Sequence, residues 1–410
     1  MDNSSNFDIK EILGKEAITT YFQPLVSVRK NEIIGYEALS RGINLSTGET
    51  LNPILLFNAA RENNSVLELD RLCRKKALET FACINISDSI LISLNIDVST
   101  INSTTAGSNH LLNTSKTLGL SPSNIVIEIL ENEIEDVEQI LNFTEIYRSH
   151  GFLIALDDIG TGHSNLDRIS LIKPDIIKLD RSLVYESEND FYRQEVIQSI
   201  VSLSHRTGSL VIAEGIESLA AALTVMKAGV DILQGYYFSM PGEFFSLDQE
   251  VIQKNLDVTA VAFREKMISE LKHVKNKRIR YEKIISSIIH SLKKSEEINF
   301  NEIITQTIQG TVEIECVYVL DSEGLQVSAT IFTDYSSIRT RNPVFRAADR
   351  GCDHSFKNYC YFILAGLSTY TTLPYISFAT GNLCITISTS FIPKNGTTYI
   401  LCCDIVYGLF

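Results

Sequence analysis

The sequence predicts an α/β fold, namely a TIM-like (β/α)8 barrel with one antiparallel strand, followed by a smaller α+β domain. In the first part, short apolar segments alternate with amphipathic ones, as in a parallel sheet covered by helices. The stretch from Val251 to Phe300 then contains no Gly or Pro and favours a long helix. The remaining residues have the pattern of strands separated by turns. We therefore expect a barrel over residues 1–247, a helical linker over 248–299 and a second domain over 300–410.

Eight apolar segments in the first part have the length and composition of strands. They are Tyr21–Leu25, Glu32–Tyr36, Leu91–Leu94, Ile125–Ile129, Phe152–Leu156, Ile176–Leu179, Leu210–Ala213 and Ile232–Leu233. Amphipathic segments between them include Pro53–Asn63, Glu68–Phe81, Val137–His150 and Phe191–Thr207. About eight strands within about 220 residues fit a (β/α)8 barrel. The first two runs are joined only by Arg29–Asn31, so we expect an antiparallel hairpin there.

The long helix predicted after the barrel carries a heptad-like apolar seam that one arginine interrupts. Its positions alternate steps of four and three residues: Met267, Leu271, Val274, Arg278, Tyr281, Ile285, Ile288 and Leu292. Such a seam fits a helix packed on its own domain, and it also fits a contribution to a homodimer. The sequence leaves both interpretations open.

The last part of the chain reads as strands and turns, with an Asp-Ser-Glu-Gly turn at 321–324 that indicates a hairpin. The pattern resembles small sensor modules of the PAS or Cache type, which implies a regulatory domain with a possible small-molecule ligand. Cys352, His354 and Cys360 could suggest a zinc or haem site, but no fourth ligand stands at a recognised spacing. The pair Cys402–Cys403 reads as strand core. A purely dimerising role for this domain remains an alternative.

Composition limits the classes of function. The net charge of −14 argues against binding a nucleic-acid polymer, because phosphate contacts need a basic surface. No apolar run is long enough for a membrane span, and the N-terminus lacks a secretory pattern. The eight scattered cysteines then read as reduced thiols, so we expect a cytoplasmic protein.

Polar side chains stand at or near the carboxyl ends of nearly all the strands after the first. They are Glu37, Asn95, Glu128, Glu131, Asp157, Asp158, Lys178, Asp180, Glu214, Glu217 and Gln234. The carboxyl ends of barrel strands meet at one rim, which carries the active site in barrel enzymes. So many acids at one rim repel one another unless a cation neutralises them. The sequence therefore predicts a functional site at this rim.

Carboxylates with one amide oxygen form a ligand set suited to Mg²⁺ or Mn²⁺. The excess of oxygen ligands favours two ions, which together can stabilise an in-line displacement at phosphorus. Lys178 could orient the nucleophile or neutralise developing charge. The residues alone thus predict metal-dependent hydrolysis of a phosphoester.

An ordered series of motifs resembles the EAL family of cyclic-di-GMP phosphodiesterases, over residues of about 15 to 245. The motifs are Gln23-Pro24, Glu37 to Arg41 (EALSR), Leu94-Asn95, Glu128 with Glu131, Asp157 to Gly162 (DDIGTG), Lys178 with Asp180, Ala213 to Glu217 (AEGIE) and Gln234 to Ser239 (QGYYFS). A lone Glu-Ala-Leu recurs by chance, so the order of the whole set carries the resemblance. It implies hydrolysis of cyclic-di-GMP to linear pGpG with two Mg²⁺ or Mn²⁺ ions.

The resemblance also implies a role for each matching residue. Metal ligands would be Glu37, Asn95, Glu128, Asp157 as the bridge, and Asp158, with Glu214 serving the second ion directly or through water. Lys178 would contact the attacking water, and Glu131 would hold the loop Asp157–Leu166. Gln23, Leu39, Arg41 and Gln234 would bind the dinucleotide, with Asp180 and Glu217 as supporting members.

Some positions depart from the family pattern. The usual EITE is Glu128-Ile129-Leu130-Glu131 here, and His163 replaces a tyrosine, which we interpret as loop packing rather than catalysis. No departure removes a ligand or the lysine, so the resemblance favours an active enzyme. The alternative is a catalytically weak EAL protein that acts as a cyclic-di-GMP receptor.

Overall fold

The computed structural model describes residues 7–84, 89–101, 107–130, 136–160, 167–311, 314–333 and 344–407. The chain forms two compact units, Met1–Lys266 and Met267–Phe410. The helix α11 (Gln249–Leu292) runs through the division between them. Among the described helices, none combines the length and the apolar character that crossing a membrane requires.

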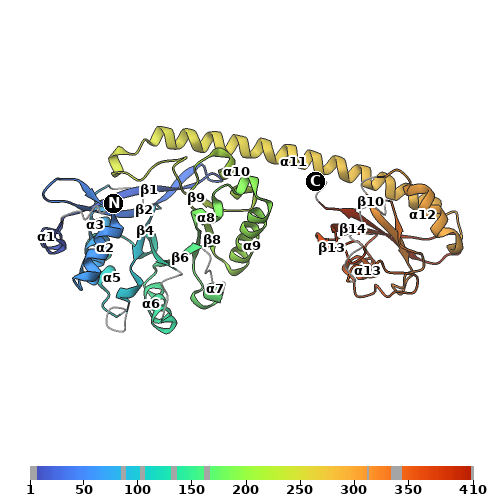
Figure 1. Cartoon of the computed structure of the whole chain (residues 1–410), viewed down its shortest axis with the longest axis horizontal. Helices are drawn as coiled ribbons and strands as arrows, with labels where there is room; N and C mark the ends of the chain where they lie inside the picture. The colour runs from blue at the N-terminus through green and yellow to red at the C-terminus, as the bar shows by residue number, and fades with distance from the viewer. Residues whose placement is uncertain are drawn as a thin grey trace. The chain divides into compact units, whose positions relative to one another are not determined.

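The first unit alternates strands and helices, and the helices lie around the outside of the strands (Figure 1). The strands are β1 (Ile18–Ser27), β2 (Glu32–Ile43), β3 (Thr50–Leu51), β4 (Leu91–Ile96), β5 (Ile125–Leu130), β6 (Leu153–Ile159), β7 (Ile176–Leu179), β8 (Leu210–Ala213) and β9 (Ile232–Leu233). The helices are α1 (Ile9–Gly14), α2 (Pro53–Glu62), α3 (Val66–Cys83), α5 (His110–Thr117), α6 (Val137–Ser149), α7 (Asp167–Ile172), α8 (Arg181–Val184), α9 (Phe191–Thr207) and α10 (Leu219–Lys227).

The strand order closes a barrel. It runs β1-β9-β8-β7-β6-β5-β4-β2, β1 also pairs with β2, and β3 adds to the edge of β2. The strand β1 is antiparallel to both of its neighbours, whereas the pairs from β2 through β4 to β9 are parallel. The predicted TIM-like barrel with one antiparallel barrel strand is therefore confirmed, with β3 as an extra strand.

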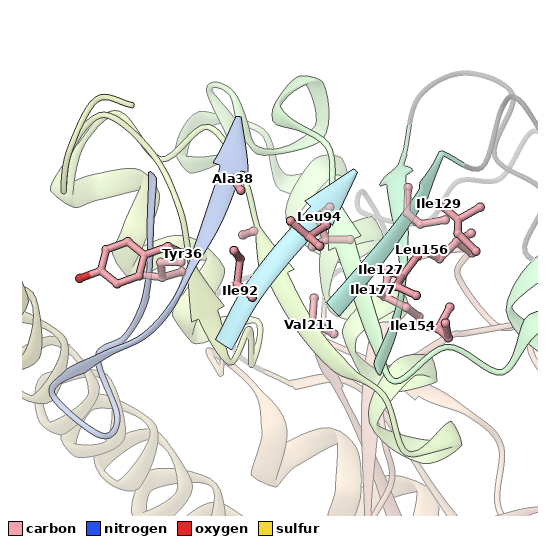
Figure 2. Close-up of a cluster of buried hydrophobic side chains, with 14 of the residues drawn as sticks. Tyr36, Ala38, Ile92, Leu94, Ile127, Ile129, Ile154, Leu156, Ile177 and Val211 are labelled. Carbon is pink, nitrogen blue, oxygen red and sulfur yellow. The ribbon is translucent and has the colours of Figure 1, made fainter. Parts of the chain in front are cut away.

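Strand alternation divides the barrel side chains into two layers. Residues on the outer face pack with the helices in a large apolar cluster, of which Figure 2 labels Tyr36, Ala38, Ile92, Leu94, Ile127, Ile129, Ile154, Leu156, Ile177 and Val211. The interior holds a smaller cluster: Leu25, Val126, Ala155, Ile176, Ile212 and Ile232. The next inward positions toward the carboxyl ends are polar, and there the functional residues lie.

One element is longer than predicted. The sequence predicts a strand over Glu32–Tyr36 with Glu37 directly after it, but β2 continues to Ile43. The reason is that β2 pairs with β1 along its whole length and gains β3 as a further partner at Gly42 and Ile43. Glu37 thus lies within a strand rather than after one.

The second unit is a six-stranded antiparallel sheet with a helix layer. It contains β10 (Ile314–Leu320), β11 (Ile331–Phe332), β12 (Thr369–Thr371), β13 (Tyr375–Ile376), β14 (Leu383–Phe391) and β15 (Tyr399–Val406), with α12 (Phe300–Ile308) and α13 (Asn358–Leu364). One face of the sheet packs on α12 and on the C-terminal part of α11. The other face packs against α13.

The apolar seam of α11 serves two environments. Its second half, Tyr281 to Leu292, is buried in the core of the second unit, as expected for a helix packed on its own domain. In its first half, Leu271 and Val274 are exposed. The seam is therefore only partly used within the chain.

Candidate active site

The barrel interior brings together the acids that the sequence places near the strand ends. Glu37, Glu128 and Asp157 alternate with outward-facing apolar residues on β2, β5 and β6, so their side chains point inward. Parallel pairing sets Asn95 on β4 opposite Glu128, and the next strand carries Asp157 opposite Leu130. All three acids are buried.

Two consecutive aspartates reach the same site because β6 is irregular. In a regular strand Asp157 and Asp158 would point to opposite faces. Here the pairing register with β7 shifts between Leu156 and Ile159, and Asp158 has a left-handed backbone with φ of 61°. Left-handed backbone at a residue other than glycine is strained and is common at functional sites. The bulge thereby places both carboxylates at the rim, where the Asp158 amide also donates to Asp157 Oδ1 at 2.8 Å.

Lys178 lies at the centre of the acids and is fully buried. Its Nζ is 2.6 Å from Glu214, 2.9 Å from Glu128, 3.2 Å from Asp157 and 3.7 Å from Glu37. Burial alone lowers the pKa of Lys178, but these four carboxylates, Asp157 foremost, together raise it well above its ordinary value. The lysine is therefore the internal counter-ion of the site.

A single lysine does not neutralise the cluster. Burial and neighbouring acids raise the pKa of Glu128 well above its usual range, that of Asp158 to about 6 and that of Glu214 to about 8. Burial also favours the neutral form of Glu37, yet Lys178 and its other partners lower the pKa of Glu37 below the ordinary value. The site therefore has more negative charge than its own cation can balance.

Amide and hydroxyl groups fix the orientation of the acids. Gln234 Nε2 donates to Glu37 Oε2 at 2.6 Å and to Gln23 Oε1 at 3.0 Å. Asn95 Nδ2 donates to Glu37 Oε1 at 2.9 Å. Ser93, which sequence reasoning missed, donates to Glu128 Oε1 from the same face of β4 as Asn95. Its position two residues before Asn95 is the signal that could have identified it.

The chemistry of the donor set fits divalent cations. Asp157, Asp158 and Glu214 each offer a carboxylate oxygen, and these oxygens lie within 4.8 Å of one another. Within the described part of the chain, the buried Oε2 of Glu128 has no hydrogen-bond partner. An orphaned carboxylate oxygen beside three converging carboxylates is what hard cations such as Mg²⁺, Mn²⁺ or Ca²⁺ require.

Two cavities open beside the acids and share Leu39 and Arg41 in their walls. One measures about 350 Å³ and also contacts Asn95, whereas the other measures about 320 Å³. The second is lined in addition by Gln23, Glu37, Glu214, Glu217, Gln234 and Arg181. The half-buried Arg41 lies over the ring of Tyr21. Tyr21 is a second residue of the site that sequence reasoning missed. A basic side chain between two cavities suits a ligand with two lobes joined by phosphate.

The remaining predicted residues lie at the edge of the site. The Asp180 carboxylate caps α8 by accepting from the Ser182 amide at 2.8 Å, and Glu217 pairs with Arg181 at 2.7 Å. The predicted loop-holding residue Glu131, His163 and most of the loop Asp157–Leu166 lie outside the described residues. Behind the rim, Gly235 allows a close approach, since a Cβ there would lie 2.1 Å from the Ile216 carbonyl oxygen.

A barrel whose acidic rim surrounds a buried lysine belongs to a class of protein suited to metal-dependent chemistry on a phosphorylated ligand. The match of a family model is more specific. Residues 8–241 match the model described as the EAL domain, which is more than half of the chain. This chain belongs to the EAL family, as its motifs indicated.

Relatives extend the likeness beyond the barrel. An uncharacterised EAL-domain protein of Bacillus subtilis, YkuI, is 28% identical over 318 residues, which cover 77% of each chain. The crystal structure of YkuI in complex with substrate c-di-GMP and calcium covers 98% of this chain and all of that one, with a TM-score of 0.78 and 25% identity. The probable cyclic di-GMP phosphodiesterase PdeI of Escherichia coli is 29% identical over 236 residues, which cover 56% of this chain and 29% of PdeI.

Proposed function

We propose that the barrel hydrolyses cyclic-di-GMP to linear pGpG with two divalent ions, Mg²⁺ or Mn²⁺. The observation that carries this proposal is the set of converging carboxylates around Lys178, placed beside two cavities that meet at Arg41. Divalent ions, when bound, supply an activated water and neutralise charge at the phosphoryl oxygens. Relatives named as cyclic di-GMP phosphodiesterases support the choice of substrate.

The position of each residue then gives its proposed role. Glu37, Asn95, Glu128 and Asp157 would hold the first ion, and Asp157, Asp158 and Glu214 the second. The ammonium group of Lys178 would hold the attacking water in line with the phosphorus. Arg41 would bind a substrate phosphate while Gln23, Leu39 and Gln234 contact the rest of the dinucleotide. Asp180 and Glu217 would support the rim, and Glu131 the adjoining loop.

The deciding experiment is an incubation of the purified chain with cyclic-di-GMP and Mg²⁺ or Mn²⁺, followed by chromatographic separation of the products. We expect pGpG, and we expect EDTA to abolish its formation because the site depends on divalent cations. Binding of cyclic-di-GMP without any pGpG would instead support the receptor alternative.

For the rest of the chain we propose a regulatory unit of PAS or Cache type that takes a small-molecule ligand. Its antiparallel sheet, with helices on one face and a cavity on the other, supports this role. We also propose a homodimer, supported by the exposed Leu271 and Val274 on α11. A cytoplasmic location is supported by the eight cysteines, none of which is paired in a disulfide in the described part of the chain.

A further inference from the structure

A cavity of about 540 Å³ opens on the α13 side of the sheet in the second unit. Its size is within the usual range of small-molecule sites. Its floor is formed by inward-facing residues of neighbouring strands, among them Tyr318 of β10 and Asp404 of β15. Its mouth carries the exposed apolar side chains of Phe356, Leu373 and Phe378 beside two basic residues, Lys357 and Arg346.

Asp404 gives the floor a carboxyl group that is almost fully buried, with only 3% of the residue exposed. Thr386 Oγ1 donates to Asp404 Oδ1 at 2.7 Å, and Cys316 Sγ lies 3.5 Å from Oδ2. Tyr375 in turn donates to Thr386 Oγ1, because the Thr386 proton is already used on the carboxylate. A hydroxyl and a thiol are weak compensation for a buried carboxylate, which ordinarily needs a cationic partner.

Three tyrosines share the cavity with this carboxylate. Tyr318, Tyr359 and Tyr375 all line the cavity, and burial first, with the charge of Asp404 in addition, raises the pKa of each phenol. Ring faces carry negative electrostatic potential and attract cations. The carboxylate and the rings therefore both favour a positively charged ligand.

The other charged and polar groups of the cavity do not occupy this place. His354 Nδ1 is hydrogen-bonded to Tyr359 at 2.8 Å, and its Nε2 is hydrogen-bonded to Gln326 at 3.0 Å. Both ring nitrogens are therefore engaged, which argues against the zinc or haem interpretation. Lys357 lies at the mouth, over the rings of Phe356 and Phe378. Among the residues the structure describes, the only group of three acids, thiols or imidazoles that converges on a metal position lies in the barrel.

We propose that this cavity binds a small organic cation, whose protonated amine forms an ion pair with Asp404 while Tyr318, Tyr359 and Tyr375 enclose it. The proposal deepens the sensor role suggested above and is independent of catalysis in the barrel. The ammonium protons satisfy the remaining lone pairs of the carboxylate, and the rings replace the water that the ammonium loses. Lys357 and Arg346 at the mouth could pair with a polar or acidic group at the other end of the same ligand.

The test uses the full chain and two pairs of probes matched in shape: 2-phenylethylamine with 2-phenylethanol, and ethanolamine with ethylene glycol. Calorimetry measures affinity, and the thermal midpoint serves as a second readout. We expect at least one amine to bind at least about tenfold more tightly than its neutral partner, as a charge-assisted bond requires. Equal affinity within both pairs would overturn the cation but leave the sensor role, whereas no binding by any probe would count against both.

Variants then assign the effect to one residue. Asp404→Asn keeps an oxygen that accepts from Thr386, so the fold should persist while the preference for amines is lost. Glu315→Gln is the matched control, because Glu315 is equally buried but is not among the cavity residues. An equal loss in both variants would overturn the assignment to Asp404. Hydrolysis of cyclic-di-GMP, assayed separately, reports on the barrel alone.

Discussion

The two units bury carboxylates in opposite ways. The barrel surrounds one lysine with four acids in direct contact and adds Asp158 at the rim. In the second unit, the buried Asp404 accepts from a hydroxyl, that of Thr386, and from a thiol, that of Cys316. In both places ionisation of the carboxyl groups is costly in a low-dielectric setting unless a bound cation completes the site. The barrel has geometry for metal ions, whereas the second unit has aromatic walls for an organic cation.

The largest expected effect tests the barrel half of this comparison. Asp157→Asn removes the charge of the proposed bridging ligand, so turnover of cyclic-di-GMP should fall by more than the roughly 10–100-fold typical of outer-shell residues. Product formation under saturating Mn²⁺ measures it. Asp190→Asn is the control, since an asparagine can still cap α9. Near-normal activity in Asp157→Asn would show that the metal assignment is wrong.

Replacing the internal counter-ion tests whether the acids depend on it. Lys178→Met should destabilise the metal-free barrel by about 3–5 kcal/mol, because removing one partner of a buried ion pair leaves uncompensated charge. Urea unfolding in EDTA measures this loss, and Mn²⁺ should restore part of it.

The matched control is Lys75→Met, which removes a partly exposed lysine from surface ion pairs with Glu16 and Glu79. That change should cost at most about 1 kcal/mol. If the two variants are equally stable without metal, Lys178 is not the counter-ion of the cluster.

The second unit should respond to pH through Asp404. Burial raises the pKa of Asp404 to about 7, from 3.8 for the unfolded chain, and the nearby Glu315 adds to the effect. Between these values the folded state holds a proton that the unfolded state has released, so stability falls as the pH rises from about 4 to about 7. The loss would approach about 4 kcal/mol.

Hydrogen exchange of β14 and β15, corrected for intrinsic rates, measures this change. Asp404→Asn should flatten the profile, while the thiols and phenols around it, Cys316, Tyr318, Tyr359 and Tyr375, have raised pKa values and stay neutral in this range. A pH dependence that persists in the variant would point to another group.

The smallest expected effect concerns the orientation of one acid. Ser93→Ala removes the hydroxyl that donates to Glu128, so activity should fall by about tenfold with little change in stability. Ser115→Ala, at a buried serine of α5 that donates to a main-chain carbonyl, should leave activity unchanged. Equal activities in the two variants would remove Ser93 from the site.

Much of the barrel could be predicted because alternation of apolar and polar residues reports burial directly. The segments Ile176–Leu179 and Leu210–Ala213 match β7 and β8 in both bounds. The extension of β2 could not be predicted, since it depends on pairing with β1 along the whole strand and with β3 at its end. The convergence of Asp157 with Asp158 likewise depends on a bulge that no alternation pattern specifies.

The second unit was less predictable. Cys402 and Cys403 are core residues as expected, on opposite faces of β15. Asp404 could not be identified from the sequence, because a single acid in an apolar strand is usually a solvent-facing residue. The fold shows that this position is buried, because Asp404 shares a face of β15 with Cys402, and α13 packs on that face.

The bulge in β6 has a consequence for redesign of the barrel. A regular strand supplies one inward side chain for every two residues, whereas this irregular segment supplies two from adjacent positions. Deleting a single residue near Ile159 would restore even pairing with β7 and rotate one aspartate out of the barrel. The composition of the acidic rim would hardly change, yet its capacity for a second cation would be lost. Ligand number at this rim is thus encoded in backbone length as much as in residue type.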